Sequence, residues 1–225
     1  MRILLKSKAL PAALALLLLG LGIPQTVDSV LWLMTGDISD QPGEASPSSA
    51  SHAASNAALL EKADAWTGDP RARIRAGVLR LRLATESGSQ MDNEQLQQAL
   101  EDLTEGLARS PANAYGWAAL AQAQIASGAL VKAKQALSTS MLIDDFDPQL
   151  SRWRTELGLL LWNELDSDDR RLWNNQVRLV WDTQPNSLVE LAKKNDGVYA
   201  PLIRFALLAD PARLASFDDA LSRRR

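Results

Sequence analysis

Apolar side chains recur at helical spacing through most of the chain beyond residue 70, and no stretch alternates apolar and polar residues as a strand would. The four main stripes are Ile74, Val78 and Leu81; Leu96, Leu100, Leu103 and Leu107; Trp153, Leu157, Leu160 and Leu161; and Trp173, Val177, Val180 and Trp181. Three shorter helices are expected around residues 187–194, 198–208 and 212–222. The pattern predicts an all-α fold.

Prolines mark the expected helix starts. Asp69-Pro70, Ser110-Pro111, Asp147-Pro148 and Asp210-Pro211 each place a capping oxygen before a proline, and Pro185 offers a related start. Asp92 with Gln95 resembles a capping box. The intervals between Pro70, Pro111, Pro148 and Pro185 are roughly 37 to 41 residues, which is typical of repeated helix pairs.

Residues 111–148 show the most specific spacing in the chain. Its members are Trp117, Leu120, Ala121, Gly128, Leu130, Ala133 and Leu137. This segment resembles one tetratricopeptide (TPR) repeat, in which small residues let two antiparallel helices approach and large residues fill the space around them. Gln124 replaces the usual tyrosine, and Asp145 stands where the closing proline is expected.

Neighbouring segments match parts of the same pattern. Ala99, Leu103, Gly106 and Pro111 fit the second half of a repeat, but residues 86–91 are too long a loop for a matching first half. Leu157-Gly158 resembles the first half of another repeat. We therefore expect one domain, residues 57–225, built as a TPR-like antiparallel helix-pair array, or short α-solenoid.

The N-terminus has the character of a membrane signal. Arg2, Lys6 and Lys8 precede an apolar run, residues 9–23, which ends at Pro24. The basic flank predicts a cytoplasmic N-terminus and export of the rest. No good cleavage site follows, so residues 1–35 are interpreted as a signal anchor with one transmembrane helix. A cleaved signal peptide and a buried helix remain the alternatives.

Residues 36–56 are rich in Gly, Pro, Ser, Ala and acidic residues and predict a flexible linker. The only histidine, His52, lies in this linker and is interpreted as incidental. The net charge of −3 argues against nucleic acid as a partner, and the absence of cysteine excludes disulfides and thiolate chemistry.

Two residue types could carry chemistry. Trp153, Trp162, Trp173 and Trp181 could stack on sugars, but their helical spacing favours a core role, with Trp162 the best candidate for exposure. Aspartates 144, 145 and 147, and aspartates 166, 168 and 169, precede helices, where capping is the simplest role. We expect no catalytic residue, no metal site and no cofactor.

The candidate partner surface is polar. It combines arginines that decorate the first expected helix with two glutamines on the first helix of the repeat: Arg71, Arg73, Arg80, Gln122 and Gln124. The arginines suit an acidic partner, although a solvated helix face explains them more simply.

The whole chain also resembles a group of bacterial polysaccharide biosynthesis proteins with a short membrane segment, a tether, about one TPR unit and a Trp-rich helical tail. The residues that carry this resemblance are 110–117, 142–148, 157–162 and 177–181. The resemblance implies a non-catalytic adaptor in the bacterial inner membrane. Its helical domain would be periplasmic, and its partners would be proteins that assemble or export an exopolysaccharide.

Two other functions remain open. One is a periplasmic TPR chaperone similar to those of cytochrome c maturation, and the other is a carbohydrate-binding protein or enzyme that uses the tryptophans and aspartates.

Overall fold

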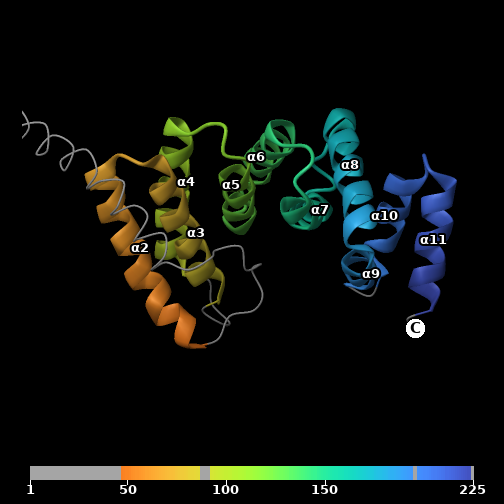
Figure 1. Ribbon diagram of the computed structural model, residues 1–225, viewed down its shortest axis with the longest axis horizontal. Coiled ribbons are helices and arrows are strands. Elements are labelled where there is room, and N and C mark those ends of the chain that lie inside the picture. Colours follow the sequence, from red (N-terminus) through yellow and green to blue (C-terminus); the bar gives the residue numbers. More distant parts are fainter. Residues whose placement is uncertain (1–46, 87–91, 195–196, 224–225) are drawn as a thin grey trace, which may run out of the picture. The chain divides into compact units, whose positions relative to one another are not determined.

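The computed structural model describes residues 47–86, 92–194 and 197–223, and within these ranges it contains helices and no strand (Figure 1). The predicted membrane segment lies outside them. The chain forms two compact units, Met1–Gly106 and Leu107–Arg225, where the sequence predicts one domain from residue 57. Among the described residues, no helix is both long enough and apolar enough to cross a membrane.

The first unit contains α2 (Pro47–Thr67), α3 (Pro70–Glu86) and most of α4 (Asn93–Arg109). Helix α2 begins at Pro47, so the prediction of a flexible linker to residue 56 is wrong for its last part. The reason is the local alanine content, since alanine is the strongest helix former. Four alanines and two leucines pack α2 on α3 in one buried cluster: Ala57, Leu60, Ala63, Ala72, Ala76 and Leu79.

Helices α3 and α4 form a close pair. A Cβ atom on Gly77 would lie 2.8 Å from Leu103 Cγ, and one on Gly106 would lie 2.6 Å from Ile74 Cγ1. Glycine is required at both positions because any side chain would separate the helices. Helix α3 is therefore the first half that the sequence pattern lacked. The sequence predicts that the length of the loop at residues 86–91 excludes such a pairing. That prediction is wrong, because α3 and α4 pair across it.

The second unit opens with α5 (Ala114–Ala126) and α6 (Leu130–Ile143), which pack along each other as the repeat spacing predicts. Ala121, Ala133 and Leu137 are fully buried, and Gly128 has a φ of +78° in the turn. Two details differ from expectation. Leu130 is 39% exposed at the first position of α6 rather than packed. Helix α5 begins after Asn113, which accepts a hydrogen bond from the Gly116 N–H, and not at Ser110-Pro111.

A further close pair consists of α7 (Pro148–Leu160) and α8 (Ser167–Thr183). A Cβ atom on Gly158 would lie 2.1 Å from Trp173 Cδ1, so the indole lies flush against the backbone of α7. The Trp173 Nε1–H donates to the Thr155 carbonyl at 3.0 Å. The predicted first half at Leu157-Gly158 is thus completed by α8.

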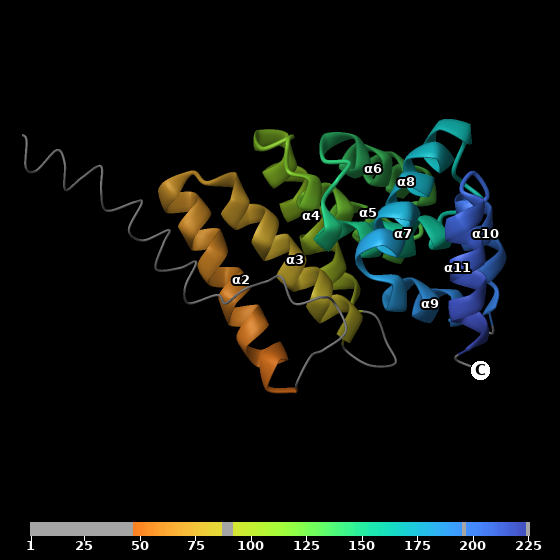
Figure 2. The ribbon, with the colours of Figure 1, turned by 45° about the vertical axis from the view of Figure 1, so that its right-hand side comes forward.

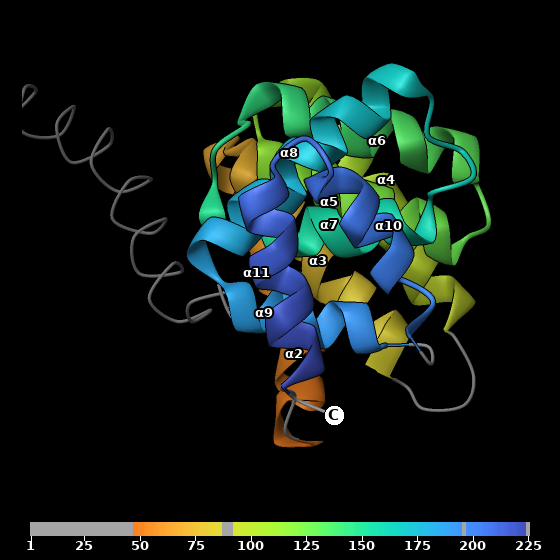
Figure 3. The same ribbon diagram turned by 90° about the vertical axis from the view of Figure 1, so that its right-hand side faces the viewer.

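Helices α9 (Pro185–Lys193), α10 (Ala200–Leu207) and α11 (Pro211–Ser222) close the second unit around α8 (Figures 2 and 3). Phe217 of α11 is fully buried and meets Trp181 of α8 edge to face, with ring centroids 5.7 Å apart. Arg213 of α11 forms two parallel contacts of 2.9 Å with the Asp182 carboxylate. The three short helices start within a few residues of their predicted positions.

Candidate functional site

The first helices of successive pairs in the second unit, α5, α7 and α9, pack in sequence, α5 on α7 and α7 on α9. Their exposed and half-buried side chains form a continuous surface, here named the first-helix face. Its members are Tyr115, Gln122, Arg152, Trp153, Glu156, Glu190 and Lys194. In TPR arrays the corresponding helices present the binding surface.

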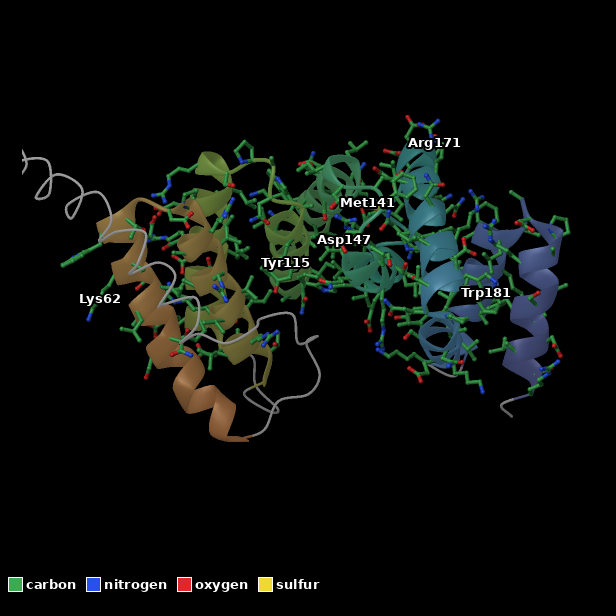
Figure 4. All side chains as sticks on the ribbon, viewed as in Figure 1. Lys62, Tyr115, Met141, Asp147, Arg171 and Trp181 are labelled. Atoms are coloured by element: carbon green, nitrogen blue, oxygen red, sulfur yellow. The ribbon has the colours of Figure 1, made fainter. Side chains whose placement is uncertain are left out.

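An aromatic and amide cluster forms the centre of the first-helix face. The rings of Tyr115 and Trp153 lie 5.4 Å apart at an interplanar angle of 56°. The Trp153 Nε1–H donates to Gln122 Oε1 at 2.8 Å, so the amide orients the indole. Both rings remain partly accessible to solvent, and Figure 4 shows Tyr115 on α5. Oriented aromatic side chains of this kind supply much of the binding energy in protein interfaces.

Charged pairs connect α7 to α9 on the same face. Lys194 Nζ lies 2.5 Å from Glu156 Oε1, and Arg152 lies 4.0 Å from Glu190. These side chains are 26% to 61% exposed, and pairs that reach solvent in this way contribute little to stability. They give the aromatic centre a polar rim with both signs of charge, which suits reversible protein association.

The predicted pairing of Gln122 with Gln124 on one surface is wrong. Residues two apart on a helix do not share a face. Gln122 bonds to Trp153 on the first-helix face, whereas the Oε1 atom of Gln124 is buried and accepts no hydrogen bond from the described part of the chain. Gln124 stands at the tyrosine position of the repeat and is half-buried.

The predicted arginine patch is also corrected. Arg73 contacts Asp102 Oδ1 and Glu105 Oε2, each at 2.7 Å, and Arg80 contacts Asp102 and, at 2.6 Å, Glu61. These ion pairs join α2, α3 and α4 inside the first unit, so both guanidinium groups already have acidic partners within the chain. Arg71 is exposed as predicted, at the start of α3. The arginines and glutamines belong to different compact units.

Asp102 is the most perturbed carboxyl group of this network, with its side chain only 2% exposed. Burial raises the pKa of Asp102 to about 6, against the lowering effect of the Arg80 and Arg73 charges. A buried carboxylate between two guanidinium groups has a structural role. Removing one partner would leave a buried charge without a counter-charge, which is strongly destabilising.

Of the four tryptophans for which the spacing predicts a core role, only Trp173 is fully buried, and Trp153, Trp162 and Trp181 are half-buried. Trp162, expected to be the most exposed, is half-buried between the edges of Trp173 and Phe205, with Arg170 4.6 Å from its ring centroid. The most exposed tryptophan among the described residues is instead Trp66 on α2, at 80% exposure.

Three of the six aspartates, Asp147, Asp166 and Asp169, cap helices as predicted. Asp147 accepts hydrogen bonds from the Gln149 and Leu150 N–H groups at the start of α7 (Figure 4). Asp166 and Asp169 form a reciprocal capping box at the start of α8. The Asp169 N–H and the Lys134 ammonium lower the pKa of Asp166 to about 2. No cluster of carboxylates or histidine that could hold a metal ion occurs among the described residues.

Sequence reasoning missed Arg154, which is completely buried in α7. Its guanidinium donates to the carbonyl of Asp144 at 2.6 Å, to the carbonyl of Ser140 at 2.8 Å and to the hydroxyl of Ser140 at 3.0 Å. Burial lowers the pKa of Arg154. The sequence did contain a signal that this position is buried. Arg154 stands three residues before Leu157-Gly158, where the TPR pattern places a buried tryptophan.

Comparison with known families supports the repeat. The profile of the tetratricopeptide repeat family matches residues 90–157, which include α4, α5, α6 and most of α7. The chain matches no curated protein and no solved structure at a significant level. The TPR repeat indicates a protein-interaction adaptor with protein partners. Repeats of this family are typically non-catalytic binding modules.

Proposed function

We propose that this chain is a non-catalytic, membrane-tethered TPR adaptor that acts in the assembly or export of a bacterial cell-surface polysaccharide. The observation that carries the adaptor role is the TPR repeat at residues 90–157, whose helices α5 and α7 contribute the aromatic centre of the first-helix face. A partner segment would lie across Tyr115 and Trp153 and meet the charged rim at α9.

The tether and the location rest on the amino-acid sequence. Three basic residues before the apolar run at 9–23 favour an N-terminus in the cytoplasm, an anchor in the inner membrane and a periplasmic helical region. The polysaccharide context rests on the resemblance of the Trp-rich tail and the repeat to exopolysaccharide biosynthesis proteins.

The first-helix face can be tested without disturbing the fold. Tyr115→Ala combined with Gln122→Ala removes two of the three members of the aromatic and amide cluster, from positions that are not fully buried. We expect polymer output and recovery of crosslinked partner proteins to fall at least about tenfold, which is about 1.4 kcal/mol of binding free energy. A matched control is Asp168→Asn with Arg171→Gln, an exposed pair on α8, which should change neither readout.

Thermal unfolding of each variant separates lost binding from lost folding. The adaptor proposal fails if the α8 control abolishes polymer output while the first-helix variant leaves it intact. Hydrolysis or transfer of polysaccharide by the purified chain would instead support the enzyme alternative. Crosslinks to haem-attachment proteins would support the chaperone alternative.

A further inference from the structure

The turn between α6 and α7 exposes a large aromatic side chain. Phe146 is 77% exposed, and Leu142, at the end of α6, is 68% exposed. Ile143 lies between them in the sequence and is also exposed. Three large apolar side chains in five consecutive residues form an unpartnered apolar patch, here named the Phe146 turn (residues 142–147), which is a feature typical of docking sites.

Buried polar groups hold the backbone of the Phe146 turn in place. The Arg154 guanidinium donates to the Asp144 carbonyl at 2.6 Å, and the Gln176 amide donates to the Asp145 carbonyl at 2.9 Å. Arg154 and Gln176 are both fully buried and come from different helices, α7 and α8. The Asp147 carboxylate closes the turn by capping α7. Phe146 is therefore presented by an anchored backbone, which lowers the entropy lost on binding.

The sequence around Phe146 is acidic. Asp144, Asp145 and Asp147 flank Phe146 along the chain, and residues 142–149 contain no lysine or arginine. The C-terminal end of α6 adds partial negative charge through its last carbonyl groups. The Arg154 charge lies beneath the turn and is inaccessible to a partner. An apolar centre with an acidic surround is complementary to an apolar side chain flanked by lysine or arginine.

From this charge pattern we infer that the Phe146 turn is a second docking surface, and that its occupant is a basic amphipathic helix of another protein. The apolar face of that helix packs on Phe146 and Leu142, and its cationic residues pair with the flanking carboxylates. This surface is separate from the first-helix face, since it uses neither Tyr115 nor Trp153, and it does not depend on the proposed function.

The test places the photocrosslinking residue p-benzoylphenylalanine at position 146 of the full chain in its native cells. We expect a crosslink to a different protein, within a segment that carries apolar residues at helical spacing and at least two cationic residues. Leu142→Ser with Asp144→Asn should reduce the yield at least about fivefold, because both apolar and charged contacts are lost. The same crosslinker at position 66, the exposed tryptophan of α2, is the control and should not give this product.

Each other outcome overturns the inference. A crosslink to a second copy of the chain identifies a self-association surface, a crosslink to lipid identifies a membrane surface, and an acidic target segment contradicts the charge argument. The absence of any crosslink shows that the turn has no partner. Tyr115→Ala with Gln122→Ala should leave the crosslink at position 146 unchanged, so this inference and the proposed function can fail separately.

Discussion

At the scale of single residues, three arginines stand where the TPR pattern places large aromatic residues. Arg154 precedes Leu157-Gly158 at the tryptophan position, and Arg73 and Arg80 occupy the tryptophan and tyrosine positions around Gly77. All three make internal contacts in the structure. A sequence pattern reads arginine as exposed, so the buried polar network could not be predicted from hydrophobicity alone.

The buried guanidinium of Arg154 should be essential to the second unit. Arg154→Met keeps the length of the side chain but leaves the Asp144 and Ser140 carbonyl groups without their donor. We expect a loss of about 3 kcal/mol or more in the free energy of unfolding, since unsatisfied buried polar groups cost about 1–3 kcal/mol each. Urea denaturation measures it. The control Arg171→Met, on the exposed side of α8, should change stability by less than about 0.5 kcal/mol.

Asp102 should make the first unit less stable as the pH rises from about 4 to 6. Its pKa in the folded chain is about 6, above the ordinary 3.8, so the folded state holds the proton more tightly than the unfolded chain. This contribution is complete below the unfolded pKa and is lost as the pH rises through the folded pKa. Asp102→Asn should remove that slope from the stability profile. The free energy of unfolding of the unchanged chain and of Asp102→Asn should be compared from pH 4 to 6. If both depend on pH in the same way, the prediction is wrong and the arginines keep Asp102 ionised throughout.

At the scale of helices, glycines allow the close packing of the helix pairs α3–α4 and α7–α8. The Cβ of Gly158→Ala would overlap the Trp173 indole, so α7 and α8 must separate although alanine is the better helix former. We expect a destabilisation of about 1–3 kcal/mol, which is typical of overpacking. Thermal and urea unfolding measure it. The double variant with Trp173→Leu should lose less stability than the sum of the losses of the two single variants, because the smaller leucine leaves space for the alanine Cβ.

The positions of most helices could be predicted because caps and prolines are local signals. Asp147, Asp166 and Asp210 cap α7, α8 and α11 through their own neighbouring N–H groups. The start of α5 was misplaced because Ser110-Pro111 has the same local form but is followed by a turn, and Asn113 caps the helix instead. The pairing of α3 with α4 was missed because Ala76 stands where the repeat places leucine, although the glycine that follows, Gly77, is present.

At the scale of the whole molecule, the division after Gly106 has no counterpart in composition. It falls within α4, and the residues on either side continue one helical stripe. Domain boundaries are visible in a sequence when a polar linker marks them, and none occurs here. The candidate site shows the same limit. The aromatic and amide cluster joins Tyr115, Gln122 and Trp153 across two helices, and such a meeting follows from the packing of α5 on α7, which local spacing does not specify.

The proposed topology can be tested on the intact chain. Alkaline phosphatase fused after Arg225 folds into an active enzyme only when it is exported, because its disulfides form in oxidising compartments. We expect an active fusion in the membrane fraction, since the basic residues before position 9 favour retention of the N-terminus in the cytoplasm. Arg2→Glu with Lys6→Glu and Lys8→Glu should lower the activity by weakening that preference. Activity recovered mainly in soluble protein with a new N-terminus near Gln25 would identify a cleaved signal peptide, and an inactive fusion would contradict export.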